Sequence, residues 1–271
     1  MGKKPSHIKW LIDTGKRLNS VDGKEIEVWE LKHHSDERVL SEWAAHFRNQ
    51  YCLDKEIGLL INGTGKTKSQ YLRDIKFPDA KIRPGPSIRS AEFAEILIAD
   101  YLEFICNYCV PRLRYLDKTI RNEPIKGSDI IGFKIVQAGI FSPDDEMIVF
   151  EVKASFSNVN RNRLQDAINS SFIDETRKSE SLNALKQKFI IRHDMQNIKI
   201  VERFQKKPDY PYIESSGAVA VLEGSVFNKT VFSETIASKH YNQNYLSLIV
   251  VKGENMMPLV HELYRRAADE A

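Results

Sequence analysis

The segment from Met147 to Lys153 places two charged residues in an otherwise apolar run that is typical of a buried strand. Residues two apart in a strand point to the same face, so Glu151 and Lys153 project together. Burying an isolated charge is costly, and each of these charges therefore needs a counter-charge, a metal ion or a substrate group. This strand constrains the fold most, because the rest of the chain must bring partners to it.

Another acidic residue, Asp129, stands at the start of a strand predicted over residues 130–137. A turn at residues 142–145 separates the two strands and predicts a hairpin that links Asp129 to Glu151. Hard divalent cations such as Mg²⁺ are commonly held by one or two carboxylates, with water and a phosphate completing the set of ligands. A metal held there would activate water, and the Lys153 ammonium would orient that water or balance developing charge.

The remaining apolar patterns predict further helices and strands. Residues 8–32 alternate as a hairpin does, and a helix is expected from a Ser35 cap to Tyr51. Residues 58–87 are rich in Gly and Pro and are interpreted as mostly loop, with a domain boundary near residue 80. The elements expected after residue 87 are a helix over 88–108, strands over 130–137 and 147–153, a helix over 161–189, strands over 218–222 and 245–251, and a helix over 257–267.

Ser128-Asp129, followed by Glu151-Val152-Lys153, resembles the motif of the PD-(D/E)xK nuclease superfamily, with Ser128 where proline is usual. The resemblance implies an α/β fold with a restriction-endonuclease-like core, a mixed sheet flanked by helices, over residues 81–271. Residues 1–80 would form an N-terminal α+β extension. It also implies hydrolysis of phosphodiester bonds with Mg²⁺ or Mn²⁺, with Asp129, Glu151 and Lys153 as catalytic residues.

The leading helix of that superfamily often supplies another acidic residue. Glu92 and Glu95 lie one helical turn apart and hence on one face of the expected helix. The resemblance favours Glu95 as a catalytic residue that binds the metal together with Asp129 and Glu151. Some members also carry a glutamine or a basic residue on the helix after the motif strand. The supporting residues implied in this way are Glu92, Gln165 and Arg163.

Three segments extend the likeness beyond the motif: Arg89–Leu97, Lys126–Phe133 and Phe150–Ser155. They resemble the HamA-type effectors of the Hachiman antiphage defence system, and the likeness covers about residues 85–170. It implies a bacterial DNase that works beside a superfamily 2 helicase subunit, a HamB-like partner. This partner would restrain the nuclease until phage DNA or damaged DNA is sensed.

Five basic residues precede Asp129 and leave two interpretations open. A solvated charged face is the ordinary one, and contact with the backbone phosphates of DNA is the other, favoured by the place of these residues beside the expected metal site. The residues are Arg112, Arg114, Lys118, Arg121 and Lys126.

Composition adds weaker constraints. The net charge of +3, from 40 Lys and Arg against 37 Asp and Glu, hints only faintly at an anionic partner. Three cysteines and no secretory signal indicate a cytoplasmic protein, and no apolar stretch reaches the roughly 18–20 residues that span a bilayer. Cys106 and Cys109 lack a second pair at zinc-site spacing and are interpreted as buried helix cysteines. The segment 63–67, Gly-Thr-Gly-Lys-Thr, lacks the first glycine of a P-loop and is interpreted as a flexible loop.

Two other functions remain open at this stage. The chain could be a catalytically silent module with a nuclease-like fold that binds nucleic acid or a partner, although the intact set Asp129, Glu151 and Lys153 argues against it. It could also be a metal-free structural subunit whose charged strand is satisfied by local salt bridges. A freely active nonspecific nuclease would harm its host, so an active chain is expected to have an inactive, partner-bound state.

Overall fold

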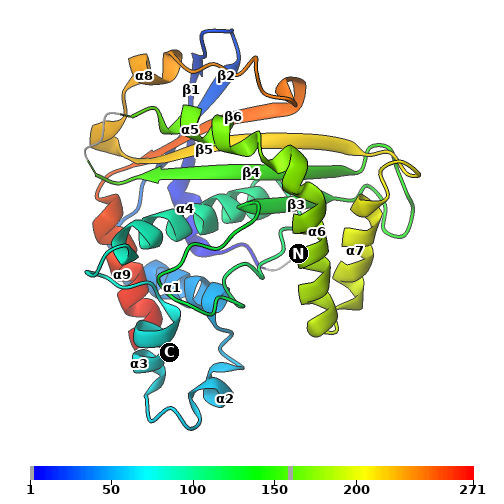
Figure 1. The fold of residues 1–271 in the computed structure, drawn as a ribbon. Helices are drawn as coiled ribbons and strands as arrows, with labels where there is room; N and C mark the ends of the chain where they lie inside the picture. The colour runs from blue at the N-terminus through cyan, green and yellow to red at the C-terminus, as the bar shows by residue number, and fades with distance from the viewer. Residues whose placement is uncertain (1–2, 158–160) are drawn as a thin grey trace.

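A computed structural model describes residues 3–157 and 161–271. Within these ranges six strands form one mixed sheet in the order β1-β2-β6-β5-β4-β3 (Figure 1). The strands are β1 (Leu11–Asn19), β2 (Glu25–Leu31), β3 (Ile130–Lys134), β4 (Glu146–Ser155), β5 (Ile213–Glu223) and β6 (Leu246–Gly253). The four central strands β2, β6, β5 and β4 are parallel to one another, whereas the edge strands β1 and β3 pair antiparallel with β2 and β4. The predicted α/β class, a mixed sheet flanked by helices, is confirmed.

Helices cover both faces of the sheet and one of its ends (Figure 1). The α-helices described are α1 (Glu37–Tyr51), α2 (Ile57–Ile61), α3 (Lys68–Tyr71), α4 (Gly85–Phe104), α5 (Arg163–Ser171), α6 (Asp174–Ile191), α7 (Met195–Gln205), α8 (Lys229–Ser233) and α9 (Met256–Asp269). Shorter turns of 3₁₀ helix span Ser6–Trp10, Gly224–Val226 and Gln243–Tyr245, and a π-helical turn spans Leu72–Lys76. Helices α1, α4 and α9 lie on one face, α5 and α8 on the other, and α6 and α7 pack at the β3-β4 end.

Alternation along the parallel strands supplies a core on each face of the sheet. In β5, Val219 and Val221 pack toward α1, α4 and α9, whereas Ala218 and Ala220 pack toward α5 and α8. The two sets alternate because successive side chains of a strand point to opposite faces. The segment Ala218–Leu222 of β5 is buried on both faces, and it is continuously apolar, as expected for a parallel strand covered by helices on both sides. The adjacent strand β4 pairs with β5 along its whole length, from Glu146 to Ser155, which gives the charged end of β4 a fixed position.

The N-terminal hairpin is part of this same sheet. Strand β2 pairs with β6 in parallel register, from Ile26 beside Leu248 to Leu31 beside Gly253. Helix α1 packs against α9, so elements from both ends of the chain lie together. The division at residue 80 stays a prediction, and the hairpin predicted over residues 8–32 is confirmed.

Several expected elements differ from the structure. The helix expected over 161–189 is two helices, because the chain leaves the sheet face after α5 and turns at Phe172 and Ile173 into α6. Helix α7 was not predicted, although the Asp194 cap and the apolar steps Ile198, Val201 and Phe204 follow helical rules. The interpretation of residues 58–87 as mostly loop was wrong in part, because it contains α3 and most of α2. Thr67 and Gln70 form a capping box at α3.

The interpretation of Cys106 and Cys109 as buried helix cysteines was wrong. Helix α4 ends at Phe104, and both cysteines lie in the segment that follows it. Cys106 is half-buried and Cys109 is exposed. The backbone of Cys109 instead exchanges two hydrogen bonds with Phe133, which extends the pairing beside β3. The two cysteines of the Cys-x-x-Cys spacing therefore lie in a loop that connects α4 to the edge of the sheet.

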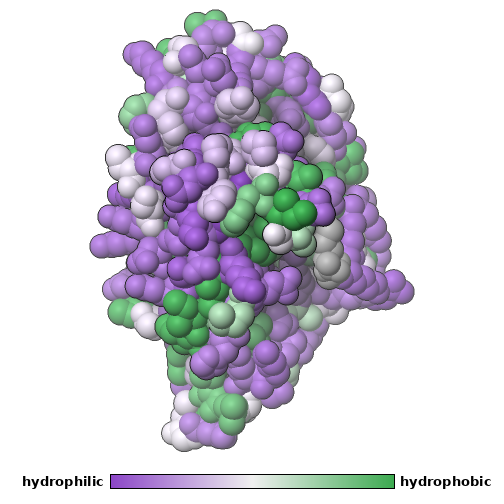
Figure 2. All heavy atoms as spheres, turned by 90° about the vertical axis from the view of Figure 1, so that its right-hand side faces the viewer, coloured by the Kyte–Doolittle hydropathy of each residue, from purple (hydrophilic) through white to green (hydrophobic). Residues whose placement is uncertain are grey.

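No helix in the described ranges is both long enough and apolar enough to cross a membrane. Hydrophilic residues cover most of the face toward the right of Figure 1, where they surround separate apolar areas (Figure 2). Scattered apolar residues of this kind are normal on a water-exposed surface.

Gly217 of β5 has no room for a side chain, because it packs directly against β4, the strand that carries Glu151 and Lys153. A Cβ atom there would lie 1.9 Å from the Phe150 ring of β4. We expect Gly217→Ala to lower the free energy of unfolding by about 1–3 kcal/mol, because overpacking forces neighbours out of their rotamers. Urea denaturation measures this change.

Gly58→Ala is the matched control for this substitution. Gly58 is exposed in α2 and has nothing within 4 Å of its added Cβ, so its free energy of unfolding should be unchanged or slightly raised. Equal stability of both variants and the wild type would contradict the close packing of β4 against β5.

Candidate active site

The β3-β4 hairpin sets Asp129 beside Glu151. Ile130 pairs with Phe150 at the start of β3, so one further step of the antiparallel register brings Asp129 opposite Glu151. The backbone N–H of Val152 donates to Asp129 Oδ2 at 3.0 Å. Strand β4 continues to Ser155, whereas β3 begins opposite Phe150. The edge of β4 after Phe150 is therefore not covered by β3 and is open to side chains from other elements.

Glu151 and Lys153 form an ion pair on one face of β4, as the two-residue spacing predicts. The Lys153 ammonium lies 2.5 Å from Glu151 Oε1. The Glu151 side chain is 12% exposed and that of Lys153 is 30% exposed, so the lysine keeps the better access to solvent. Burial, followed by the negative charge of Asp129, raises the pKa of Glu151 to about 8.

Helix α4 supplies two more carboxylates, from Glu92 and Glu95. Tyr115 donates a hydrogen bond to Glu95, and Lys118 pairs with Glu92 in the protein interior. Burial raises the pKa of Glu95 to about 7, a shift that the charge of Asp129 increases and that of Arg114 opposes. The negative charge of Glu95 therefore interacts with that of Asp129 on the hairpin.

Arg114 lies between the helix and the hairpin. Its Nη2 donates to Asp129 Oδ1 at 3.0 Å, and its Nε is 2.8 Å from Glu95 Oε2. Its Nη1 donates to the carbonyl of Ser128 and its Nη2 also to that of Ile125. The side chain is 17% exposed, so the guanidinium is a nearly buried cation shared by two candidate catalytic residues.

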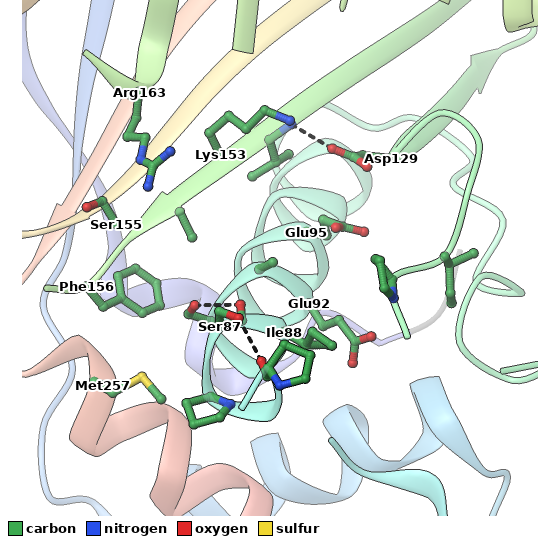
Figure 3. A pocket seen from close by; sticks show the side chains of 18 of the residues that line it. Ser87, Ile88, Glu92, Glu95, Asp129, Lys153, Ser155, Phe156, Arg163 and Met257 are labelled. Atoms are coloured by element: carbon green, nitrogen blue, oxygen red, sulfur yellow. Dashed lines mark hydrogen bonds between the residues drawn. The ribbon is translucent and has the colours of Figure 1, made fainter. Parts of the chain in front are cut away.

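A cavity of about 830 Å³ is lined by Asp129, Arg114 and Lys153, by the N-terminal half of α4 and by the start of α9 (Figure 3), and Glu151 lies next to it on β4. Asp129, Glu95 and Lys153 lie toward one end of it, and Phe156 and Met257 toward the other (Figure 3). The cavity is of the size that binds substrates in proteins. It combines carboxylates, a lysine and an apolar wall, which suits a ligand with both charged and flat apolar parts.

The two supporting residues expected on the next helix differ in position. Arg163 extends its guanidinium toward the cavity, and its Nε is buried without a hydrogen-bond partner among the described residues (Figure 3). Gln165 is directed elsewhere: its side chain exchanges hydrogen bonds with the backbone of Ile236 and donates to Asn169. Arg163 thus lies at the site, whereas Gln165 ties α5 to the segment after α8.

The basic residues before Asp129 are mostly engaged within the protein. Besides Arg114 and Lys118, Arg112 pairs with Asp100 and Glu103, and Arg121 pairs with Asp79. The fifth residue, Lys126, is exposed. The charges of four residues in this cluster therefore have carboxylate partners, and contact of the cluster with DNA stays a prediction.

Asp174, at the start of α6, is a further acidic residue near the site that sequence patterns did not indicate. Its Oδ1 accepts a hydrogen bond from the Ser128 hydroxyl at 2.8 Å, while Oδ2 is buried without a partner among the described residues. Burial, with a contribution from Asp129, raises the pKa of Asp174 to about 6. Its position at a helix start would have been the only sequence signal, because acidic residues commonly occupy the first turn.

The donors present fit a hard divalent cation. In the described part of the chain, no three Asp, Glu, His or Cys side chains come together as a ready metal site. Asp129 and Glu151 nevertheless provide two neighbouring carboxylates, the number through which Mg²⁺ is commonly bound when water and phosphate complete its ligands. Glu95, the third carboxylate expected at the metal, pairs with Arg114 and accepts a hydrogen bond from Tyr115. Mn²⁺ accepts the same oxygen donors.

The mixed sheet flanked by helices, with an acidic pair and a lysine at the hairpin edge, defines an α/β protein with a nuclease-like core. The chain belongs to the HamA family, whose model matches residues 5–267. This match confirms the resemblance to the HamA-type effectors of the Hachiman defence system, and it covers the N-terminal hairpin as well as the motif strands. A comparison with curated proteins finds no match.

The raised pKa of Glu151 makes stability depend on pH. Between the ordinary value of 4.5 and about 8, the folded chain holds a proton that the unfolded chain has lost. The free energy of unfolding should therefore fall as the pH rises through this window, and Glu151→Gln should flatten the fall because glutamine stays neutral. Urea denaturation from about pH 5 to about pH 8 in EDTA measures both slopes.

Glu146→Gln is the control, because Glu146 lies on the same strand and bonds to Ser215 away from Asp129. It should keep the wild-type fall in stability. The same fall in Glu151→Gln would show that Glu151 does not carry the extra proton.

Proposed function

We propose that this HamA-family chain is a metal-dependent nuclease that hydrolyses DNA phosphodiester bonds as the effector subunit of an antiphage defence complex. The observation that carries the proposal is the adjacency of Asp129, Glu151 and Lys153 at the edge of β4. Two carboxylates and an ammonium beside an open cavity are the groups that phosphodiester hydrolysis needs.

Asp129 and Glu151 would hold Mg²⁺ or Mn²⁺, which when bound supplies an activated water and polarises the phosphate. Lys153 is the most exposed of the three side chains and reaches into the cavity (Figure 3). Its ammonium would orient the attacking water or balance the charge that develops on the phosphate. Ionisation of Glu151 is favoured once a cation lies beside it, because an opposite charge stabilises the carboxylate.

The cavity supports a nucleic acid as the substrate. Arg163 brings a guanidinium toward it: Nη1 pairs with Asp166, whereas Nε has no partner among the described residues, and guanidinium groups bind phosphate well. Phe156 and Met257 provide apolar surface beside the charged end, suited to a base or a sugar. DNA is the substrate implied by the family to which the chain belongs.

A superfamily 2 helicase subunit is the partner that we propose. The segment 63–67 does not supply a nucleotide-binding loop. Its Lys66 pairs with Asp74 and its Thr67 caps α3. ATP hydrolysis would then belong to the partner. Since unrestrained DNA cleavage would harm the host, the helicase complex would hold the nuclease inactive until it is triggered.

Purified protein should cleave linear and plasmid DNA only with Mg²⁺ or Mn²⁺, alone or with the helicase subunit and ATP. We expect Glu151→Ala and Lys153→Ala to lower the cleavage rate by about 100-fold or more, because each removes a group that acts on the reacting phosphate. EDTA should abolish cleavage. Gel assays of initial rates measure each effect.

Lys252→Ala is the control, since Lys252 lies on β6 and pairs with Glu30 away from the cavity. It should cut at the wild-type rate. If the wild type stays inert in every condition, or if the β4 variants cut equally well, the chain is instead a silent module that binds nucleic acid or its partner.

A further inference from the structure

Arg114 places a positive charge inside the acidic site. Its guanidinium lies between Glu95 on α4 and Asp129 at the start of β3, at 2.8 and 3.0 Å. These are two of the three carboxylates assigned to the metal. The position between them is where the charge of a bound divalent cation would be most favourable, because both carboxylates are drawn toward a positive group.

Both oxygens of Asp129 are already engaged. Oδ2 accepts the N–H of Val152, whose backbone is fixed in the sheet, and Oδ1 accepts Nη2 of Arg114. Each oxygen keeps a second lone pair, but the bond to Arg114 is the one that a metal ion can replace with its own positive charge, because the Val152 backbone is fixed in the sheet. A guanidinium left beside a divalent cation would also repel it, so the two cations exclude each other from this carboxylate.

The segment that carries Arg114 holds the acidic helix at two further points. It follows α4, and its Tyr115 and Lys118 contact Glu95 and Glu92. The guanidinium is itself fixed by the carbonyls of Ser128 and Ile125. The segment thus balances or hydrogen-bonds the carboxylates of α4 with side chains that are held in place by other contacts.

We infer that Arg114 is a built-in counter-ion that competes with the divalent metal for Asp129 and Glu95, so that loading the site requires its guanidinium to withdraw. The inference rests on the proposed metal-dependent function and adds a control on it. While Arg114 stays in place, its guanidinium pairs with Asp129 and with Glu95, and of the three carboxylates only Glu151 has no contact with it among the described residues.

Metal affinity tests the inference without an activity assay. Isothermal titration calorimetry of the full chain with Mn²⁺, in the absence of nucleic acid, compares the wild type with Arg114→Gln. Loss of the competing cation should tighten Mn²⁺ binding at least about tenfold, and Asp129→Asn should abolish binding in either background. Unchanged or weaker binding by Arg114→Gln would show that the guanidinium positions the carboxylates and does not compete.

Arg121→Gln is the matched control, because it removes a charge from the same segment where the partner is Asp79. It should bind Mn²⁺ as the wild type does, and an equal gain in this variant would overturn the inference in favour of a general charge effect. If Arg114→Gln does not fold by circular dichroism, Arg114→Lys replaces it. A lysine keeps the charge but cannot bridge both carboxylates, so it should give a smaller gain, and no gain would count against the inference.

The outcomes separate this inference from the proposed function. If the wild type binds Mn²⁺ through Asp129 and Arg114→Gln binds it no more tightly, only the competing role of Arg114 is disproved. No binding dependent on Asp129 in either the wild type or Arg114→Gln removes the metal site itself, and the proposed function with it.

Discussion

Neutralising a group of buried carboxylates is the constraint on which the rest of this structure depends. Asp129, Glu151, Glu92 and Glu95 lie in or beside one cavity, where their charges would be costly without counter-charges. Each has a basic partner: Arg114 for Asp129 and Glu95, Lys118 for Glu92, and Lys153, on the same strand, for Glu151. These ion pairs join α4, the segment after it and the β3-β4 hairpin into one unit.

The sequence was sufficient where the chemistry is local. Asp129 and Glu151 are joined by a hairpin, so a turn at residues 142–145 and the two-residue period of the strands were enough to bring them together. Glu92 and Glu95 followed from helical spacing. The α/β class followed from the order of the elements and from the resemblance to the superfamily.

The rest depends on contacts between distant segments, which periodicity does not encode. The segment from Arg112 to Lys126 has no regular apolar pattern, and its basic residues look the same in sequence whether they face water or a carboxylate. Only the fold shows that Arg114 and Lys118 turn inward. The pairing of β2 with β6 joins strands more than 200 residues apart, and no local pattern indicates it.

The N-terminal hairpin and α1 contribute to the acidic helix as well as to the sheet. The Tyr51 hydroxyl of α1 donates its one hydrogen to Glu92 Oε2 at 2.7 Å. The 2.5 Å contact between the hydroxyls of Tyr51 and Tyr264 must then be donated by Tyr264 of α9. With Lys118 on Oε1, each oxygen of Glu92 has a partner in the protein and the charge of Glu92 is balanced without a metal.

Glu92 is therefore better suited to holding α4 in place than to binding the metal. Residues from both ends of the chain converge on it, from α1 through Tyr51 and from α9 through Tyr264. A change of packing between α1 and α9 would thus be transmitted to α4 and, one helical turn further, to Glu95 and Arg114.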